Sequence, residues 1–76
     1  MGLRRVFAEN LRRLRTDRGL SQEALADSAG IDRTYISSLE RCRYAASIDV
    51  VDRLARELGT EASDLLLRPG RQAPDR

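Results

Sequence analysis

Two short helical segments that meet at a glycine constrain the fold of this chain more than any other feature of its sequence. Ser21 is a good N-cap for a helix over residues 22–28, and Gly30 stops that helix after two turns. Asp32 follows as the cap of a third helix that ends at residue 40 or 41. Helices joined by so short a turn cross steeply, so they need a small residue where they approach, a glycine in the turn and inward-facing apolar residues. The sequence meets these demands with Ala26, Gly30, Leu25, Ala29, Ile31, Ile36 and Leu39.

Apolar periodicity predicts one longer helix before this pair. The helix covers residues 3–18 and is ended by Gly19, and its apolar stripe consists of Leu3, Phe7, Leu11 and Leu14. Its opposite side carries charges of alternating sign at a spacing of four residues, namely Arg5, Glu9, Arg13 and Asp17.

The sequence predicts two helices after the pair. Ser47 is expected to cap a fourth helix that Gly59 stops, with a stripe formed by Ile48, Val51, Leu54, Ala55 and Leu58. A brief fifth helix covers about residues 61–67. No stretch alternates long enough to form a strand, so we predict an all-α fold, a compact five-helix bundle. Residues 1–67 form one domain, and residues 68–76 are expected to be a flexible tail because they begin with Arg68-Pro69-Gly70.

Composition excludes several classes of function. The chain of 76 residues has one cysteine and no histidine, so it cannot build an intrachain disulfide or a Cys/His zinc site. It has no paired carboxylates at a recognisable spacing and no glycine-rich phosphate loop, so we expect no enzyme, no metal, no cofactor and no small-molecule ligand. No apolar run is long enough to cross a membrane and no export signal is readable, so we expect a cytoplasmic protein.

Charge is distributed unevenly along the chain, although the formal net charge is only +2. Residues 1–20 carry six arginines against two acids, whereas residues 47–67 carry two arginines against five acids. A basic first half and an acidic second half are what we expect if the first half meets phosphate and the second half meets another subunit.

The segment from Gln22 to Arg41 resembles the helix-turn-helix of the phage-repressor (Cro-like, XRE) family of DNA-binding proteins. The resemblance covers about residues 4–67, including Phe7, Leu11, the run Gly19-Leu-Ser-Gln22 and the pair Leu58-Gly59. Within this family, the run Asp32-Arg-Thr-Tyr-Ile-Ser-Ser-Leu-Glu-Arg41 is most similar to the small controller proteins of restriction-modification systems. The resemblance to this family implies a lambda-repressor-like domain whose third helix enters the major groove of double-stranded DNA.

The resemblance assigns base reading to the outward residues of the third helix, which are Arg33, Thr34, Ser37 and Ser38. Arg33 carries the most weight because a guanidinium can bond O6 and N7 of guanine together. Contacts with the sugar-phosphate backbone are expected from Gln22 at the start of the second helix, and from residues after the third helix, namely Arg41, Arg43, Tyr44 and Ser47. The alternative for those four is a solvated loop.

Arg15 and Tyr35 are each expected to contribute both to the packing of the domain and to contact with DNA. Arg15 and Glu40 match an ion pair seen in phage repressors, so we expect them to meet and to leave Arg15 able to share a phosphate. Tyr35 either packs on the second helix or reaches the DNA with its hydroxyl, and we expect partial burial with contact.

One helix-turn-helix unit contacts only a few base pairs, so a homodimer on a palindromic site is expected. The candidate interface residues are apolar residues in excess of what a small core can bury, namely Val50, Leu65, Leu66 and Leu67, although Leu65 or Leu66 is expected to close the monomer core instead. We therefore predict a sequence-specific transcriptional regulator, with a restriction-modification operon as its candidate target. The alternative is a protein-interaction module, such as an antitoxin, built on the same bundle.

Overall fold

The computed structural model describes residues 2–68, and within that range it contains five helices and no strand. The helices are α1 (Leu3–Asp17), α2 (Gln22–Ala29), α3 (Arg33–Glu40), α4 (Ile48–Leu58) and α5 (Ala62–Leu65). The all-α prediction is confirmed. The flexible tail predicted for residues 68–76 lies, apart from Arg68, outside the described residues.

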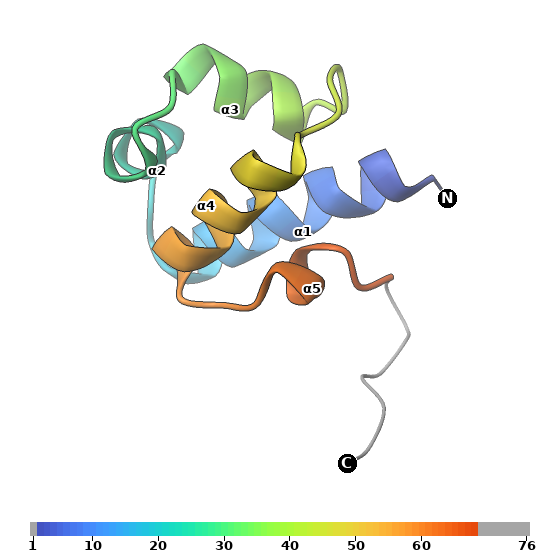
Figure 1. The fold of residues 1–76 in the computed structure, drawn as a ribbon. Helices are drawn as coiled ribbons and strands as arrows, with labels where there is room; N and C mark the ends of the chain where they lie inside the picture. Colours follow the sequence, from blue (N-terminus) through green and yellow to red (C-terminus); the bar gives the residue numbers. More distant parts are fainter. Residues whose placement is uncertain (1, 69–76) are drawn as a thin grey trace.

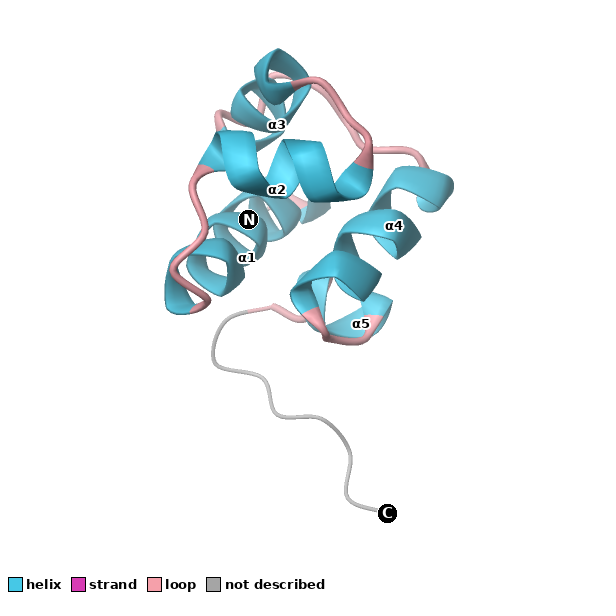
Figure 2. Cartoon of the chain, turned by 90° about the vertical axis from the view of Figure 1, so that its left-hand side faces the viewer, coloured by secondary structure: helices cyan, strands magenta, loops and turns pink. Residues whose placement is uncertain are grey.

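The helices surround one core (Figures 1 and 2). Helix α3 packs against both α1 and α2, while α4 packs against α2 and α5. Figure 1 shows α3 at the top of the molecule and α5 below α1 and α4, and Figure 2 shows α2 in front of α3. Helix α3 therefore has one side against the bundle and one side facing outward.

The predicted apolar stripes account for most of the core. The fully buried side chains include Leu11, Leu25, Ile36, Leu39 and Leu54. Two stripe residues do not belong to it, because Ile48 is 87% exposed and Leu3 is 47% exposed. Both are the first residues of their helices, and these first turns extend past the edge of the core.

Helix α5 is shorter than predicted, because the chain leaves the helix at Leu66. The amide of Asn10, buried in α1, explains the early end. Its Nδ2 donates to the carbonyl oxygens of Leu65 and Leu67, both at 2.9 Å. These carbonyls thus receive their hydrogen bonds from a side chain of α1 and not from further turns of α5. Asn10 was not singled out from the sequence, since a polar residue on an amphipathic helix is normally a surface residue.

The helix caps follow the sequence with one departure at each end of α3. Ser21 and Ser47 accept hydrogen bonds from the backbone N–H of Ala24 and Val50, as predicted. Asp32 has the position and dihedral angles of an N-cap, but its side chain makes no capping hydrogen bond.

At its other end, α3 terminates like α2, with the chain in the left-handed region, but the residue is Cys42 (φ 64°) where α2 has Gly30 (φ 68°). The N–H of Arg43 bonds to the carbonyl of Ser38 at 2.9 Å, which completes a Schellman motif.

Candidate nucleic-acid interface

The outward side of α3 carries the four predicted base-reading residues. Arg33 and Thr34, in the first turn, are exposed, whereas Ser37 and Ser38 are partly buried. In the described part of the chain, the guanidinium of Arg33 makes no hydrogen bond or ion pair, so all its donors are available to an external acceptor. The inward side of the same helix is anchored by Ile36 and Leu39, both fully buried. The helix is therefore fixed by its apolar side while it presents short polar side chains and one arginine outward.

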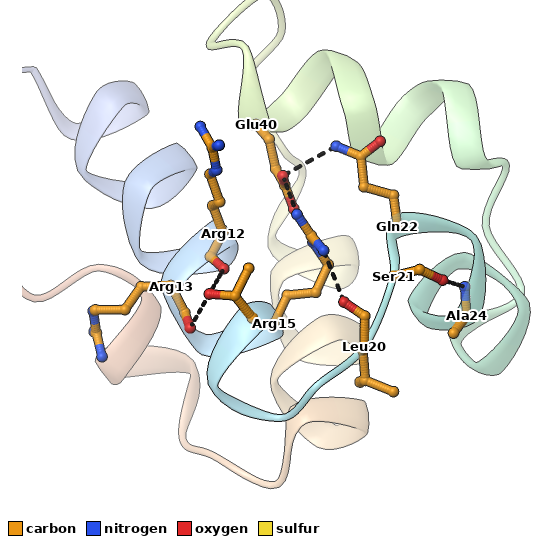
Figure 3. Close-up of polar contacts among 9 residues, drawn as sticks. Arg12, Arg13, Arg15, Leu20, Ser21, Gln22, Ala24 and Glu40 are labelled. Carbon is orange, nitrogen blue, oxygen red and sulfur yellow. Dashed lines mark hydrogen bonds and ion pairs between the residues drawn. The ribbon is translucent and has the colours of Figure 1, made fainter.

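A polar network holds the C-terminal end of α3 against α1 and α2 (Figure 3). The Glu40 carboxylate accepts hydrogen bonds from Arg15 Nε at 2.7 Å and Arg15 Nη2 at 3.0 Å. Arg15 Nη1 donates to the carbonyl oxygen of Leu20 at 2.7 Å, in the turn between α1 and α2. Gln22 Nε2 donates to Glu40 Oε1 at 3.1 Å. The expected Arg15–Glu40 pair is confirmed, and one carboxylate joins three helices.

Burial of this network limits what Arg15 can do. Its side chain is 11% exposed and that of Glu40 is 4% exposed. The hydrogen bond to Glu40 raises the pKa of the Arg15 guanidinium, and the charge of Glu40 adds to this effect while burial opposes it. Three of the five N–H donors of Arg15 are already used, so its main role in this structure is to position Glu40.

Gln22 lies in the first turn of α2, where the free backbone N–H groups of a helix N-terminus favour an anion. Its side chain is partly buried, and one of its two amide hydrogens is bonded to Glu40, so the amide orientation is fixed before any ligand arrives. The second amide hydrogen remains a donor. The sequence did not predict that Glu40 would orient Gln22.

The segment after α3 carries the other residues that were predicted to contact the sugar-phosphate backbone of DNA. Arg41, Arg43, Tyr44 and Ser47 are all exposed, and neither arginine has a side-chain partner among the described residues. The Ser47 hydroxyl accepts from Val50 N–H, which leaves its own hydrogen free to donate. Tyr35 is partly buried and packs against the core, so the predicted partial burial is confirmed, and its contact with DNA stays a prediction.

The arginines divide into those that pair with groups of this chain and those whose guanidinium is free to contact a phosphate. On α1, Arg5 lies within 4 Å of Glu9 and Arg13 within 4 Å of Asp17, so two pairs of the predicted charge ladder are confirmed. Six described arginines make neither an ion pair nor a side-chain hydrogen bond. Five of them lie on α1, on α3 or directly after α3, namely Arg4, Arg12, Arg33, Arg41 and Arg43, and the sixth is Arg53 on α4. Arg12 was not predicted as a site residue, although it precedes Arg15 by three positions and so lies on the same side of α1, as Figure 3 shows.

The predicted interface residues divide into two groups. Leu65 is fully buried in the core and Val50 is partly buried against it. Leu65 is therefore the residue that closes the monomer core, as expected for one of Leu65 and Leu66, and it is corrected as an interface residue because it has no surface to offer a partner. Leu66 and Leu67 are each 37% exposed and remain candidates.

Among residues 2–68, no group of three or more His, Cys, Asp or Glu side chains could hold a metal ion. No helix in this described range is long and apolar enough to span a bilayer.

The comparisons with known proteins agree with this geometry. A helix-turn-helix family model matches residues 11–65, well over half of the chain. The chain belongs to the helix-turn-helix family. Among curated relatives, a hypothetical transcription factor of Neisseria meningitidis is 45% identical over 67 residues, which are 88% of this chain and 63% of that protein. The control protein C.SmaI of Serratia marcescens is 40% identical over 70 residues, covering 92% of this chain and 83% of that protein.

Solved structures of helix-turn-helix proteins show the same fold. The crystal structure of the Neisseria factor superposes with a TM-score of 0.87 at 44% identity, over 90% of this chain and 78% of that one. The restriction-modification controller protein C.Esp1396I, solved as a tetramer with its 35 base-pair operator, superposes with a TM-score of 0.78 at 26% identity, over 86% of both chains. The fold of this helix-turn-helix chain is therefore shared with transcription factors and with controller proteins.

Proposed function

We propose that this protein is a sequence-specific DNA-binding transcriptional regulator, which binds a palindromic operator as a homodimer and acts in the cytoplasm. The observation that carries the proposal is the outward side of α3. It presents Arg33 and Thr34, exposed and with side chains free of intramolecular partners, on a helix whose other side is fully buried. A side chain that reads bases must be free to bond and its helix must be rigid.

Base reading is assigned to Arg33 above all. Its guanidinium can donate two parallel hydrogen bonds to guanine, and such a pair discriminates against other bases by about 1–3 kcal/mol. Thr34 offers a hydroxyl and a methyl group, while Ser37 and Ser38 are shorter, partly buried and less discriminating. The proposal therefore expects one dominant guanine contact in each half-site.

Residues before and after α3 in the sequence are assigned the contacts with the DNA backbone that fix the position of α3 along the major groove. Gln22 contributes its second amide hydrogen and the N-terminus of α2, and Arg41, Arg43, Tyr44 and Ser47 contribute donors after α3. The network around Glu40 supports both groups, because it connects the end of α3 to the start of α2. Arg15 contributes mainly as the positioning partner of Glu40, with two donors left for a phosphate.

A restriction-modification operon is the target class we propose. Support comes from the similarity to C.SmaI along 83% of that control protein's length, and from the shared fold with C.Esp1396I. A regulator of such an operon needs no chemistry beyond binding, which agrees with the lack of a recognisable catalytic constellation in the sequence.

Selection of bound duplexes from a random DNA library tests the proposal directly, with a salt titration on the selected site for the wild type and Arg33→Ala. We expect a palindrome, an affinity that falls steeply with salt, and a loss of preference at one base in each half-site of the variant. Arg53→Ala, at an exposed unpaired arginine on α4, is the matched control and should keep the wild-type preference. A library with no enriched sequence would contradict the proposal and favour a protein-interaction module.

A further inference from the structure

An apolar groove opens at the end of the bundle where α1 and α4 begin. Its lining comes from three separate parts of the chain: Leu3 and Phe7 of α1, Ala46 before α4 with Val51 within it, and Leu66 after α5. Its volume is about 290 Å³, and Arg4 lies at its rim. We call this the end groove. The start of α1 and the segment that follows α3, which both contribute lining residues, lie on the right in Figure 1.

Exposed apolar side chains gather at the same end. Ile48 is 87% exposed, and it precedes the groove residue Val51 by three positions, so both lie on one side of α4. Leu3 and Leu66, which line the groove, are also exposed, as is Leu67. Exposed apolar side chains beside an apolar groove favour an interaction site, because leaving them in water is unfavourable.

We propose that the occupant of the end groove is a second copy of this chain, with Ile48 of each copy inserted into the groove of the other. The proposal rests on the homodimer proposed above and assigns its surface. The end carries both a projecting side chain and a hollow, so two copies related by a two-fold axis satisfy each other and the contact closes at two. A projecting residue and a hollow on distant surfaces would instead build open chains.

Charge at the groove supports the same occupant. Arg4 at the rim and Asp49, next to Ile48, have no ion pair within the described residues of one copy. Insertion of Ile48 brings the neighbouring Asp49 toward the rim of the other copy's groove, so Arg4 and Asp49 of opposite copies become complementary. The two-fold axis repeats this pair, which gives two such contacts in one dimer.

The position of the groove also suits two reading helices. Figure 1 shows α3 across the top of the bundle, and its C-terminal end leads into the segment that contributes Ala46 to the end groove. A two-fold axis that runs vertically past this end leaves the α3 helices of both copies at the top. Both helices then face the same side of the dimer, as binding to successive major grooves on one side of DNA requires.

Sedimentation over a dilution series tests the assignment with a matched pair of variants. Ile48→Asp is at the first position of α4, where an acidic residue favours the helix, so the monomer should fold. We expect it to raise the dimer dissociation constant at least ~100-fold, since it puts a charge in an apolar groove. Ser28→Asp adds the same charge at an exposed position on α2 and should dimerise like the wild type. A wild type that stays monomeric, or an Ile48→Asp that dimerises normally, would overturn the proposal.

A charge exchange tests the Arg4–Asp49 contact separately. Arg4→Glu and Asp49→Arg should each weaken the dimer, and the double variant should recover most of the loss. A double variant weaker than either single variant would overturn this pairing. The sedimentation result stands even if no DNA is bound, whereas loss of operator binding with an intact dimer would count against the proposed function alone.

Discussion

The Glu40 carboxylate of α3 lies 2.7 Å from Nε and 3.0 Å from Nη2 of Arg15 in α1, across 25 positions of sequence. Because Gln22 of α2 also donates to Glu40, the end of the reading helix is bonded to both neighbouring helices. Apolar packing fixes the depth of α3 in the bundle, and this network fixes the position of its C-terminal end. The candidate interface is therefore organised by a pair that itself faces inward.

Removal of one member of this pair should be costly. Glu40→Ala leaves the Arg15 charge almost buried without its partner, so we expect a loss of about 3–5 kcal/mol in the free energy of unfolding. Glu40→Gln keeps an acceptor oxygen and should cost less. Asp52→Ala is the control, because its pair with Arg56 is exposed and should contribute less than about 1 kcal/mol. Urea unfolding followed by circular dichroism measures all three, and equal losses for Glu40→Ala and Asp52→Ala would refute the expectation.

The arginines after α3 should affect affinity without affecting sequence preference. Arg41→Ala and Arg43→Ala each remove an exposed, unpaired cation, so each should weaken binding to specific and scrambled duplexes by a similar factor. Each should also lower the slope of log affinity against log salt by about one. Fluorescence anisotropy across a salt series gives both quantities. An unchanged slope would show that the arginine touches no phosphate.

The left-handed conformation of Cys42 should make glycine the better residue at that position. At φ 64° a side chain is strained, and relief of that strain is worth about 1 kcal/mol. We compare Cys42→Gly with Cys42→Ala, since both remove the thiol and only glycine relieves the strain. Thermal unfolding should show Cys42→Gly to be more stable than Cys42→Ala by about that amount. Equal stabilities would mean that the segment after α3 adjusts at no cost.

The sequence predicted what short-range patterns determine. Apolar periodicity located the first and fourth helices, and capping and glycine signals located the others, because each signal depends on residues within about four positions. The end of α3 was harder to predict, because the residue in the left-handed conformation after this helix is Cys42, whereas that residue is usually a glycine.

Relationships between distant segments could not be predicted in this way. Asn10 meets Leu65 and Leu67 across more than fifty positions, and no local pattern on α1 distinguishes it from a surface residue. The exposure of Ile48 depends on where the core ends, which the stripe on α4 does not show. In the candidate site, residue identities came from the family resemblance, whereas the bond from Gln22 to Glu40 emerged only from the arrangement of three helices.

Asn10 should be more important to stability than its residue type suggests. Asn10→Ala leaves the carbonyl of buried Leu65 without its donor, so we expect a loss of about 1–3 kcal/mol and faster hydrogen exchange in α5. Arg5→Ala is the control, since it removes only an exposed ion pair with Glu9 on the same helix. Hydrogen exchange read by NMR separates the two effects. An α5 that exchanges equally in both variants would contradict the role of Asn10.

Stability at low pH should depend on Asp64, at the start of α5. The hydrogen bond from the Thr60 hydroxyl, at 2.6 Å, lowers the pKa of Asp64 below its ordinary 3.8. The Glu61 N–H lowers it further, burial opposes these effects, and the charge of Arg13 adds a last lowering. Folding therefore favours the carboxylate. The resulting stabilisation is present above the unfolded pKa and is lost as pH falls through the lower folded pKa.

Thr60→Val removes the largest cause of that pKa shift and so tests the dependence on pH. At about pH 7 the variant should be less stable than the wild type, because the carboxylate loses its strongest donor. As pH falls below about 4, Asp64 becomes protonated in both proteins and the difference between them should shrink. The other carboxylates are common to both proteins, so their titration cancels in the comparison. Urea midpoints measured from about pH 7 down to about pH 2.5 provide the test, and a difference independent of pH would mean that Thr60 stabilises α5 without acting through the charge of Asp64.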